Sequence, residues 1–163
     1  MKKKFLIAAA IAIAGGGALH FLYDALPNPL TALISPVNES VWEHLKLLFW
    51  PMLLTAFWLA RKTPDRYALW SGIFVAELLM PLILMGGFYI LQCGFGVVSL
   101  PLDIGMYVVT MCLGYLIAYL VFKSRHLEKA AVWLLVPVIF YGASLILFTF
   151  AAPQFGVFIP PEA

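Results

Sequence analysis

Residues 61–91 read RKTPDR followed by YALWSGIFVAELLMPLILMGGFYIL, a short basic segment and then a long apolar run. In the run from 67 to 91, Glu77 is the single charged side chain. A helix that crosses the hydrocarbon core of a bilayer needs about 20 mostly apolar residues. This stretch therefore predicts a transmembrane helix that begins directly after a basic loop.

Four further runs have the same character, at residues 5–23, 41–60, 102–122 and 130–151. The whole chain is 64% hydrophobic and 11% charged, whereas soluble domains are roughly 45–50% apolar and 25% charged. A chain of 163 residues has too little interior to bury this excess, so lipid is the expected solvent. We predict one all-α domain over residues 1–163, a polytopic membrane helix bundle with about five transmembrane helices and a Pro-rich tail from Pro153.

The basic residues predict the orientation of this bundle. Nine of the ten Lys and Arg lie in three segments: residues 2–4, 61–66 and 123–129. Five spans place these three segments on one face, and basic loops face the cytoplasm. We expect a multi-pass protein of the cell membrane with a cytoplasmic N-terminus, an external C-terminus and the lipid bilayer as its surroundings. No basic patch with interleaved aromatic residues suggests a nucleic-acid partner.

The first apolar run also resembles a secretory signal peptide, because Lys2–Lys4 precede it and Ala12-Ile13-Ala14 has the form of a cleavage site. The run continues through Tyr23, which favours a retained helix. In that case the small residues 14–18 predict a surface where another helix packs closely.

Titratable residues are concentrated at the predicted outer ends of the helices. His20 and Asp24 are four residues apart, and Ser35-Pro36 has the form of a helix start, with Ser at the N-cap and Pro next. A helix that begins there places Glu39, Glu43 and Lys46 on one face and Ser40 and His44 on the neighbouring face. At 1.5 Å of rise per residue, one layer at roughly 22–29 Å from the cytoplasmic ends holds several of these side chains. The layer contains His20, Asp24, Glu43, His44 and Asp103, with Glu39 slightly higher and Glu77 near mid-membrane.

Five carboxylates and one lysine leave an excess of negative charge. At this depth in the membrane that charge must be offset by bound protons, a cation or access to water. Imidazole and carboxylate groups together favour a divalent transition metal such as zinc. We predict His20, His44, Glu39 and Asp103 as metal ligands and Glu43 or Asp24 as a general base. Asn38, Ser40, Lys46 and Glu77 are predicted as further polar members of the site. The alternative for Glu43 and Lys46 is a structural ion pair, and the alternative for Asp103 is a helix cap.

Two segments carry a family resemblance: residues 19–24, LHFLYD, and residues 35–51, SPVNESVWEHLKLLFWP. In these segments the chain resembles a family of small, uncharacterised bacterial membrane proteins, classed as a domain of unknown function. The resemblance implies a multi-pass membrane protein and supplies no activity. Ser40 and His44 are also weakly similar to a motif of the ceramidase and progestin-receptor group of zinc-dependent membrane hydrolases. That group needs histidines on a late helix, and this chain has none between His44 and His126.

Three functions follow as hypotheses. The first is a metal-dependent membrane hydrolase that opens at the outer face. The second is a small transporter or ion or proton pathway that uses Glu77 and the outer acidic cluster. The backbone carbonyl of Glu77, which Pro81 leaves without a helical donor, belongs to this pathway. The third is a non-catalytic subunit or assembly factor, with a second copy or another membrane protein as its partner.

Overall fold

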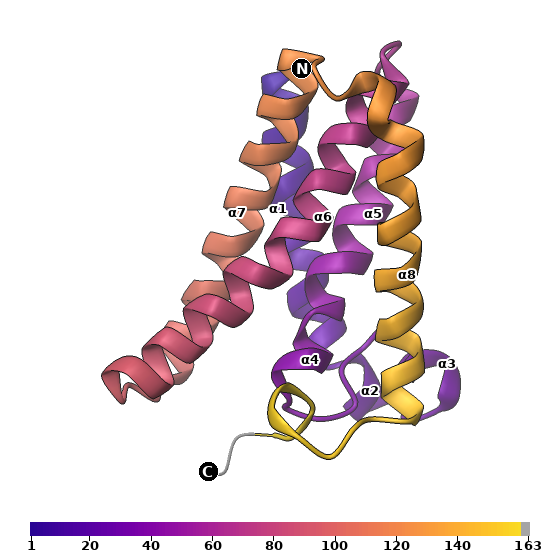
Figure 1. The fold of residues 1–163 in the computed structure, drawn as a ribbon. Helices are drawn as coiled ribbons and strands as arrows, with labels where there is room; N and C mark the ends of the chain where they lie inside the picture. The colour runs from indigo at the N-terminus through magenta and orange to yellow at the C-terminus, as the bar shows by residue number, and fades with distance from the viewer. Residues whose placement is uncertain (161–163) are drawn as a thin grey trace.

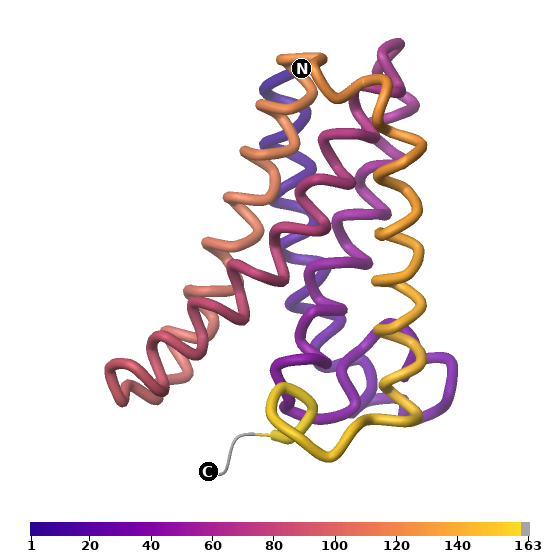
Figure 2. Tube along the Cα trace, in the orientation of Figure 1, coloured from indigo at the N-terminus to yellow at the C-terminus, as the bar shows by residue number. Residues whose placement is uncertain are grey.

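The computed structural model describes residues 1–160, and these residues form helices and loops without a strand. The predicted all-helical class is confirmed. Five long helices run roughly side by side and are joined by shorter ones (Figure 1; Figure 2). In chain order they are α1 (Lys2–His20), α2 (Leu22–Ala25), α3 (Pro29–Ala32), α4 (Val41–His44), α5 (Lys46–Arg61), α6 (Arg66–Tyr89), the π-helical η1 (Ile90–Gly94), α7 (Leu100–Ser124), the 3₁₀ turn η2 (Glu128–Ala130), α8 (Ala131–Phe150) and the 3₁₀ turn η3 (Gly156–Phe158).

Four stretches of the described chain are long and apolar enough to cross a membrane: Lys2–His20, Arg66–Gly94, Leu100–Ser124 and Glu128–Phe150. They correspond to four of the five predicted spans. The predicted span 41–60 is divided at Leu45 into the four-residue α4 and the 16-residue α5. Large apolar side chains such as Trp133 and Phe140 on α8 are exposed on the outside of the bundle, as expected for surfaces that meet lipid.

The bundle has two chemically different ends (Figure 1). At one end lie the N-terminus, the α5–α6 connection and the α7–α8 connection, and we call it the basic end because it holds nine of the ten Lys and Arg. Lys4 Nζ donates to the Lys62 carbonyl oxygen at 2.9 Å, and Arg125 pairs with Asp65 at 2.9 Å, so the three basic segments lie together. At the opposite end, which we call the histidine end, the segment 22–40 folds beneath α5 and α8, while α6 and α7 lean away as a pair.

Small residues allow the helices to approach closely. A Cβ atom on Gly72 of α6 would lie 2.4 Å from the Ala118 carbonyl oxygen of α7. A Cβ atom on Gly16 of α1 would lie 2.6 Å from the Leu47 carbonyl oxygen of α5. The predicted packing surface on the first helix is therefore confirmed at Gly16, whereas a Cβ on Gly17 would meet open space.

The predicted helix start at Ser35-Pro36 is wrong. The Ser35 hydroxyl donates to the Leu19 carbonyl oxygen at 2.6 Å and accepts from the Tyr23 amide at 3.0 Å, which ties the segment to the end of α1. The helix begins at Val41 instead, and its N-cap is Ser40, whose Oγ accepts from the Glu43 amide at 3.3 Å. Because Glu39 precedes this helix, it does not share a face with Glu43 as predicted.

The first helix also ends earlier than expected. It ends at His20, and Asp24 lies on the separate short helix α2, where its side chain is exposed. The helix α3 was not predicted. Its N-cap Asn28 accepts from the amides of Leu30 and Thr31, and Pro29 occupies the first helical position.

Candidate metal site

The segment 22–40 is held to the bundle by Lys46, the one basic residue at the histidine end. Lys46 is fully buried, and its Nζ donates to the Ala32 and Ser35 carbonyl oxygens at 2.8 and 3.2 Å. The indole of Trp50 adds a bond to the Leu33 carbonyl oxygen at 3.0 Å. These bonds satisfy backbone carbonyl oxygens that have no hydrogen-bond donor within a helix. They also fix the path of the chain that leads to Glu39.

Glu43, one of the two predicted general bases, is buried where the segment 22–40 meets α5 and α8. Its Oε2 accepts from Lys46 Nζ at 2.7 Å and from the Val37 amide at 2.9 Å, and its Oε1 accepts from the Thr149 hydroxyl at 3.1 Å. Its exposed fraction is 2%. The negative charge of this carboxylate is balanced by Lys46, and the group is enclosed by protein. The geometry of Glu43 and Lys46 therefore fits the alternative prediction, a structural ion pair.

His44 follows Glu43 directly and faces the other way, towards α1. Its Nδ1 lies 2.9 Å from the Ser40 carbonyl oxygen, and its Nε2 lies 3.2 Å from Nε2 of His20. A carbonyl oxygen only accepts, so Nδ1 of His44 carries the proton and Nε2 of the neutral ring presents a lone pair. A backbone partner of this kind on the far ring nitrogen is the usual support of a metal-ligating histidine.

Glu39 completes a group of three with these histidines. Its Oε2 lies 3.3 Å from Nε2 of His44 and 3.8 Å from Nε2 of His20, and one donor atom from each residue lies within 4.8 Å of the other two. Zinc bonds of about 2.0–2.1 Å at tetrahedral angles separate neighbouring ligand atoms by about 3.3 Å. The three side chains could therefore hold a metal ion with little adjustment. The Glu39 side chain is 68% exposed, which leaves the group open to solvent.

The remaining predicted site residues lie around or away from this group. Asp103 is in the first turn of α7 and is not one of the three clustered donors. Asn38 Oδ1 accepts from the Ser40 amide at 2.9 Å and so shapes the turn that carries Glu39. Asp24 and Glu77 do not join the group either, and Glu77 is buried in the middle of α6.

Two contacts of the site had no signal in the sequence. Thr149 reaches Glu43 from the end of α8, 106 residues away along the chain. Val37 donates its backbone amide to the same carboxylate. An amide presents no side-chain chemistry, and a lone threonine near the end of an apolar run is ordinary in a membrane helix, so neither could be recognised in advance.

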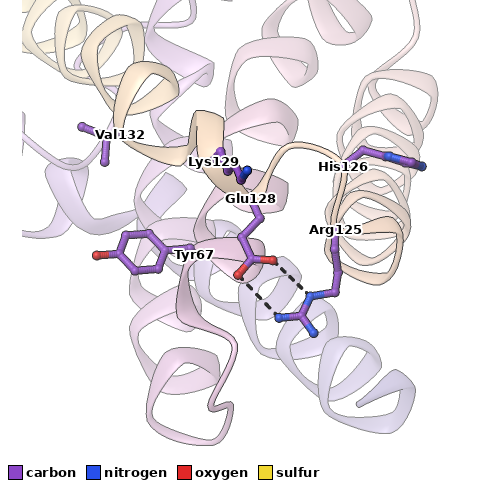
Figure 3. Close-up of a pocket in the computed structure, with 6 residues that line it drawn as sticks. All are labelled: Tyr67, Arg125, His126, Glu128, Lys129 and Val132. Atoms are coloured by element: carbon purple, nitrogen blue, oxygen red, sulfur yellow. Dashed lines mark hydrogen bonds and ion pairs between the residues drawn. The ribbon is translucent and has the colours of Figure 1, made fainter.

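The basic end has a different character. A shallow hollow of about 760 Å³ there is lined by Tyr67, Arg125, His126, Glu128, Lys129 and Val132 (Figure 3). Arg125 pairs with Glu128 at 3.1 Å as well as with Asp65, and the hydrogen bond to Glu128 and the charge of Asp65 raise the pKa of Arg125. Arg125 in this hollow is thus matched by two carboxylates, and the group of metal-binding donors in the described chain lies at the histidine end instead.

The comparison with known proteins agrees with the expected membership of an uncharacterised domain family. No curated protein and no solved structure matches the chain. Residues 1–161 match the family of unknown function DUF6512, which confirms the expectation of an uncharacterised domain family. Since the match covers nearly the whole chain, the protein belongs to the DUF6512 family.

Proposed function

We propose that this protein crosses the cell membrane five times, with the basic end in the cytoplasm and the histidine end outside. The stretch from Val41 to Arg61 supplies the fifth span, because α4 and α5 together rise roughly 31 Å at 1.5 Å per residue. The concentration of Lys and Arg at one end supports the orientation. In this arrangement His20, Glu39 and His44 face the external water.

We further propose that His20, Glu39 and His44 bind a divalent transition metal, with zinc as the first candidate. The observation that carries this proposal is the spacing of the three donor atoms, 3.2, 3.3 and 3.8 Å, beside about 3.3 Å for tetrahedral zinc. Two histidines and one glutamate are a ligand set of catalytic zinc sites, which keep a fourth position for water or substrate. Zinc bound in this way is a Lewis acid that activates water for hydrolysis.

The function that this site supports best is therefore metal-dependent hydrolysis at the outer face of the membrane. His44 is oriented for binding by the Ser40 carbonyl, and Glu39 brings the negative charge that offsets the cation. Glu43 is bound to Lys46 and serves to hold the segment that positions Glu39. Of the two predicted bases, Asp24 remains exposed at the surface.

The test is a measurement of the metal content of the full-length protein. The protein is purified in detergent and loaded with zinc, and unbound zinc is then removed. We expect about one zinc per chain in the wild type and almost none in His44→Ala, because two ligands hold zinc far more weakly than three. His126→Ala is the matched control, since His126 is an exposed histidine at the basic end. Equal zinc in wild type and His44→Ala, or no zinc in either, would overturn the metal site.

A second measurement tests the hydrolase assignment separately. The loaded protein is incubated with a total membrane-lipid extract in mixed micelles, and the products are identified by mass spectrometry. We expect cleavage products with wild type and His126→Ala that disappear with His44→Ala or after chelation. If the wild type binds zinc and yet releases no product at any zinc loading, the hydrolase assignment is wrong while the metal site stands.

A further inference from the structure

Glu77 is the most unusual buried group of the molecule. It lies in the middle of α6 with an exposed fraction of 0%, and neither of its carboxylate oxygens has a hydrogen-bond partner within residues 1–160. None of the ion pairs in that part of the chain involves Glu77. The one basic residue away from the basic end, Lys46, is already bound to Glu43.

The titratable groups that face Glu77 are phenols rather than cations. Tyr115 of α7 and Tyr141 of α8 are the phenols near Glu77. The Tyr115 hydroxyl is hydrogen-bonded to Thr55 of α5, whereas the Tyr141 hydroxyl is buried and has no partner within the described residues. Neutral phenols cannot compensate a carboxylate charge in a membrane helix, where an unpaired charge is very costly. A neutral carboxylic acid avoids this cost.

Polar side chains of α7 lie between this position and the histidine end, without hydrogen bonds to one another in the described chain. On α7, Asp103, Tyr107, Thr110 and Tyr115 lie on the side that faces the bundle, over roughly 18 Å at 1.5 Å of rise per residue. The Tyr107 hydroxyl donates to the Ile13 carbonyl oxygen at 2.9 Å, and the buried Thr110 hydroxyl has no partner in the described chain.

In the half of the bundle nearer the basic end, Tyr119 of α7 is half-buried and its ring packs against Phe5 of α1. Beyond Tyr115 the buried position of α7 is Ala118. On α6 the buried Ser71 donates its hydroxyl proton to the Ala68 carbonyl oxygen of its own helix. Of the polar side chains on this face of α7, Asp103, Tyr107 and Thr110 lie on the histidine-end side of Tyr115.

We propose that Glu77 is an intramembrane proton-binding site that exchanges its proton with the histidine end along the polar face of α7. The O–H bond of the Glu77 acid breaks, and its proton passes to water that enters along this face of α7. One proton thus reaches water and one carboxylate is left behind, and the reverse steps restore the acid. This site is separate from His20, Glu39 and His44 and functions without a bound metal.

The first test uses dicyclohexylcarbodiimide, an apolar reagent that adds to protonated carboxyl groups and gives a stable adduct where water is excluded. The full-length protein in detergent is treated, digested and mapped by mass spectrometry. We expect an adduct on Glu77 and none on Glu43, which is equally buried but ionised against Lys46. Absence of an adduct on Glu77, or equal labelling of Glu43, would overturn the proposal. Because the wild type is the sample, the result does not depend on a variant that folds.

The second test follows the route of exchange by infrared spectroscopy. A protonated carboxyl band that is absent from Glu77→Gln should shift when the protein is moved into heavy water. We expect Thr110→Val, which removes one hydroxyl of the polar face of α7 and keeps its shape, to slow this shift by roughly tenfold. Ser71→Ala, the matched control on the basic side, should leave the rate unchanged. A band that shifts at the same rate in Thr110→Val, or that is slowed by Ser71→Ala instead, would overturn the route to the histidine end.

Discussion

Glu43 and Glu77 are two carboxylates buried to nearly the same degree in one apolar bundle, at 2% and 0% exposure, yet their surroundings are opposite. Glu43 accepts hydrogen bonds from Lys46, Val37 and Thr149, and Glu77 has no partner within residues 1–160. Burial alone therefore says little about the role of an intramembrane acid. A fully partnered carboxylate stabilises structure, and one without partners has to carry a proton or bind a ligand.

The partners of Glu43 also show what it stabilises. Lys46 belongs to α5, Thr149 to α8 and Val37 to the loop that precedes Glu39, so one carboxylate connects three parts of the histidine end. The neighbouring His44 faces outward to His20. Two consecutive residues thus provide a structural acid and a candidate ligand, and the candidate metal site depends on the hydrogen bonds of Glu43 behind it.

The largest effect is expected for Glu43→Gln. The change leaves Lys46 buried without its counter-charge, and loss of one partner of a buried pair costs about 3–5 kcal/mol of unfolding free energy. The measurement is reversible unfolding of the purified protein in mixed micelles. Glu128→Gln, which removes a carboxylate at the basic end, is the control and should unfold like the wild type. Unchanged stability of Glu43→Gln would show that Lys46 finds other compensation and would remove the contrast with Glu77.

A smaller loss is expected when both partners are replaced, as in Glu43→Gln with Lys46→Met. Replacing a buried ion pair by uncharged groups of similar volume is often close to neutral. The bonds of Lys46 to Ala32 and Ser35 are lost as well, so we expect a net loss of about 1–2 kcal/mol. The same unfolding assay, read as a double-mutant cycle with the two single variants, measures the coupling. A double variant as unstable as the sum of the single ones would mean that the two side chains act independently.

The helices were predictable from the sequence and the site was predictable only in part, for a physical reason. A membrane helix requires a continuous apolar run, so four of the predicted spans correspond to long helices within a few residues. The approach of His20 and His44 followed from their equal depth. Glu39 was predicted as a ligand, but its position was predicted wrongly on a helical face beside Glu43, because Ser35-Pro36 has the form of a helix start. Tertiary bonds from Ser35 to Leu19 and from Lys46 to Ala32 override that local preference and turn Glu39 towards the histidines.

The smallest effect is expected for Glu77→Gln, the same substitution at the other buried carboxylate. If Glu77 carries a proton, the change exchanges a neutral acid for a neutral amide of nearly the same shape. Neither has a partner in the described chain, so the unfolding free energy should change by less than about 1 kcal/mol. An ionised Glu77 would give another result, because removal of an uncompensated buried charge stabilises by several kcal/mol. The sign and size of this difference, measured beside Glu43→Gln in the same micelles, therefore report the charge of Glu77 in the folded protein. A strong gain in stability would contradict the proton-binding site, and a loss as large as that of Glu43→Gln would reveal a partner that stabilises the carboxylate.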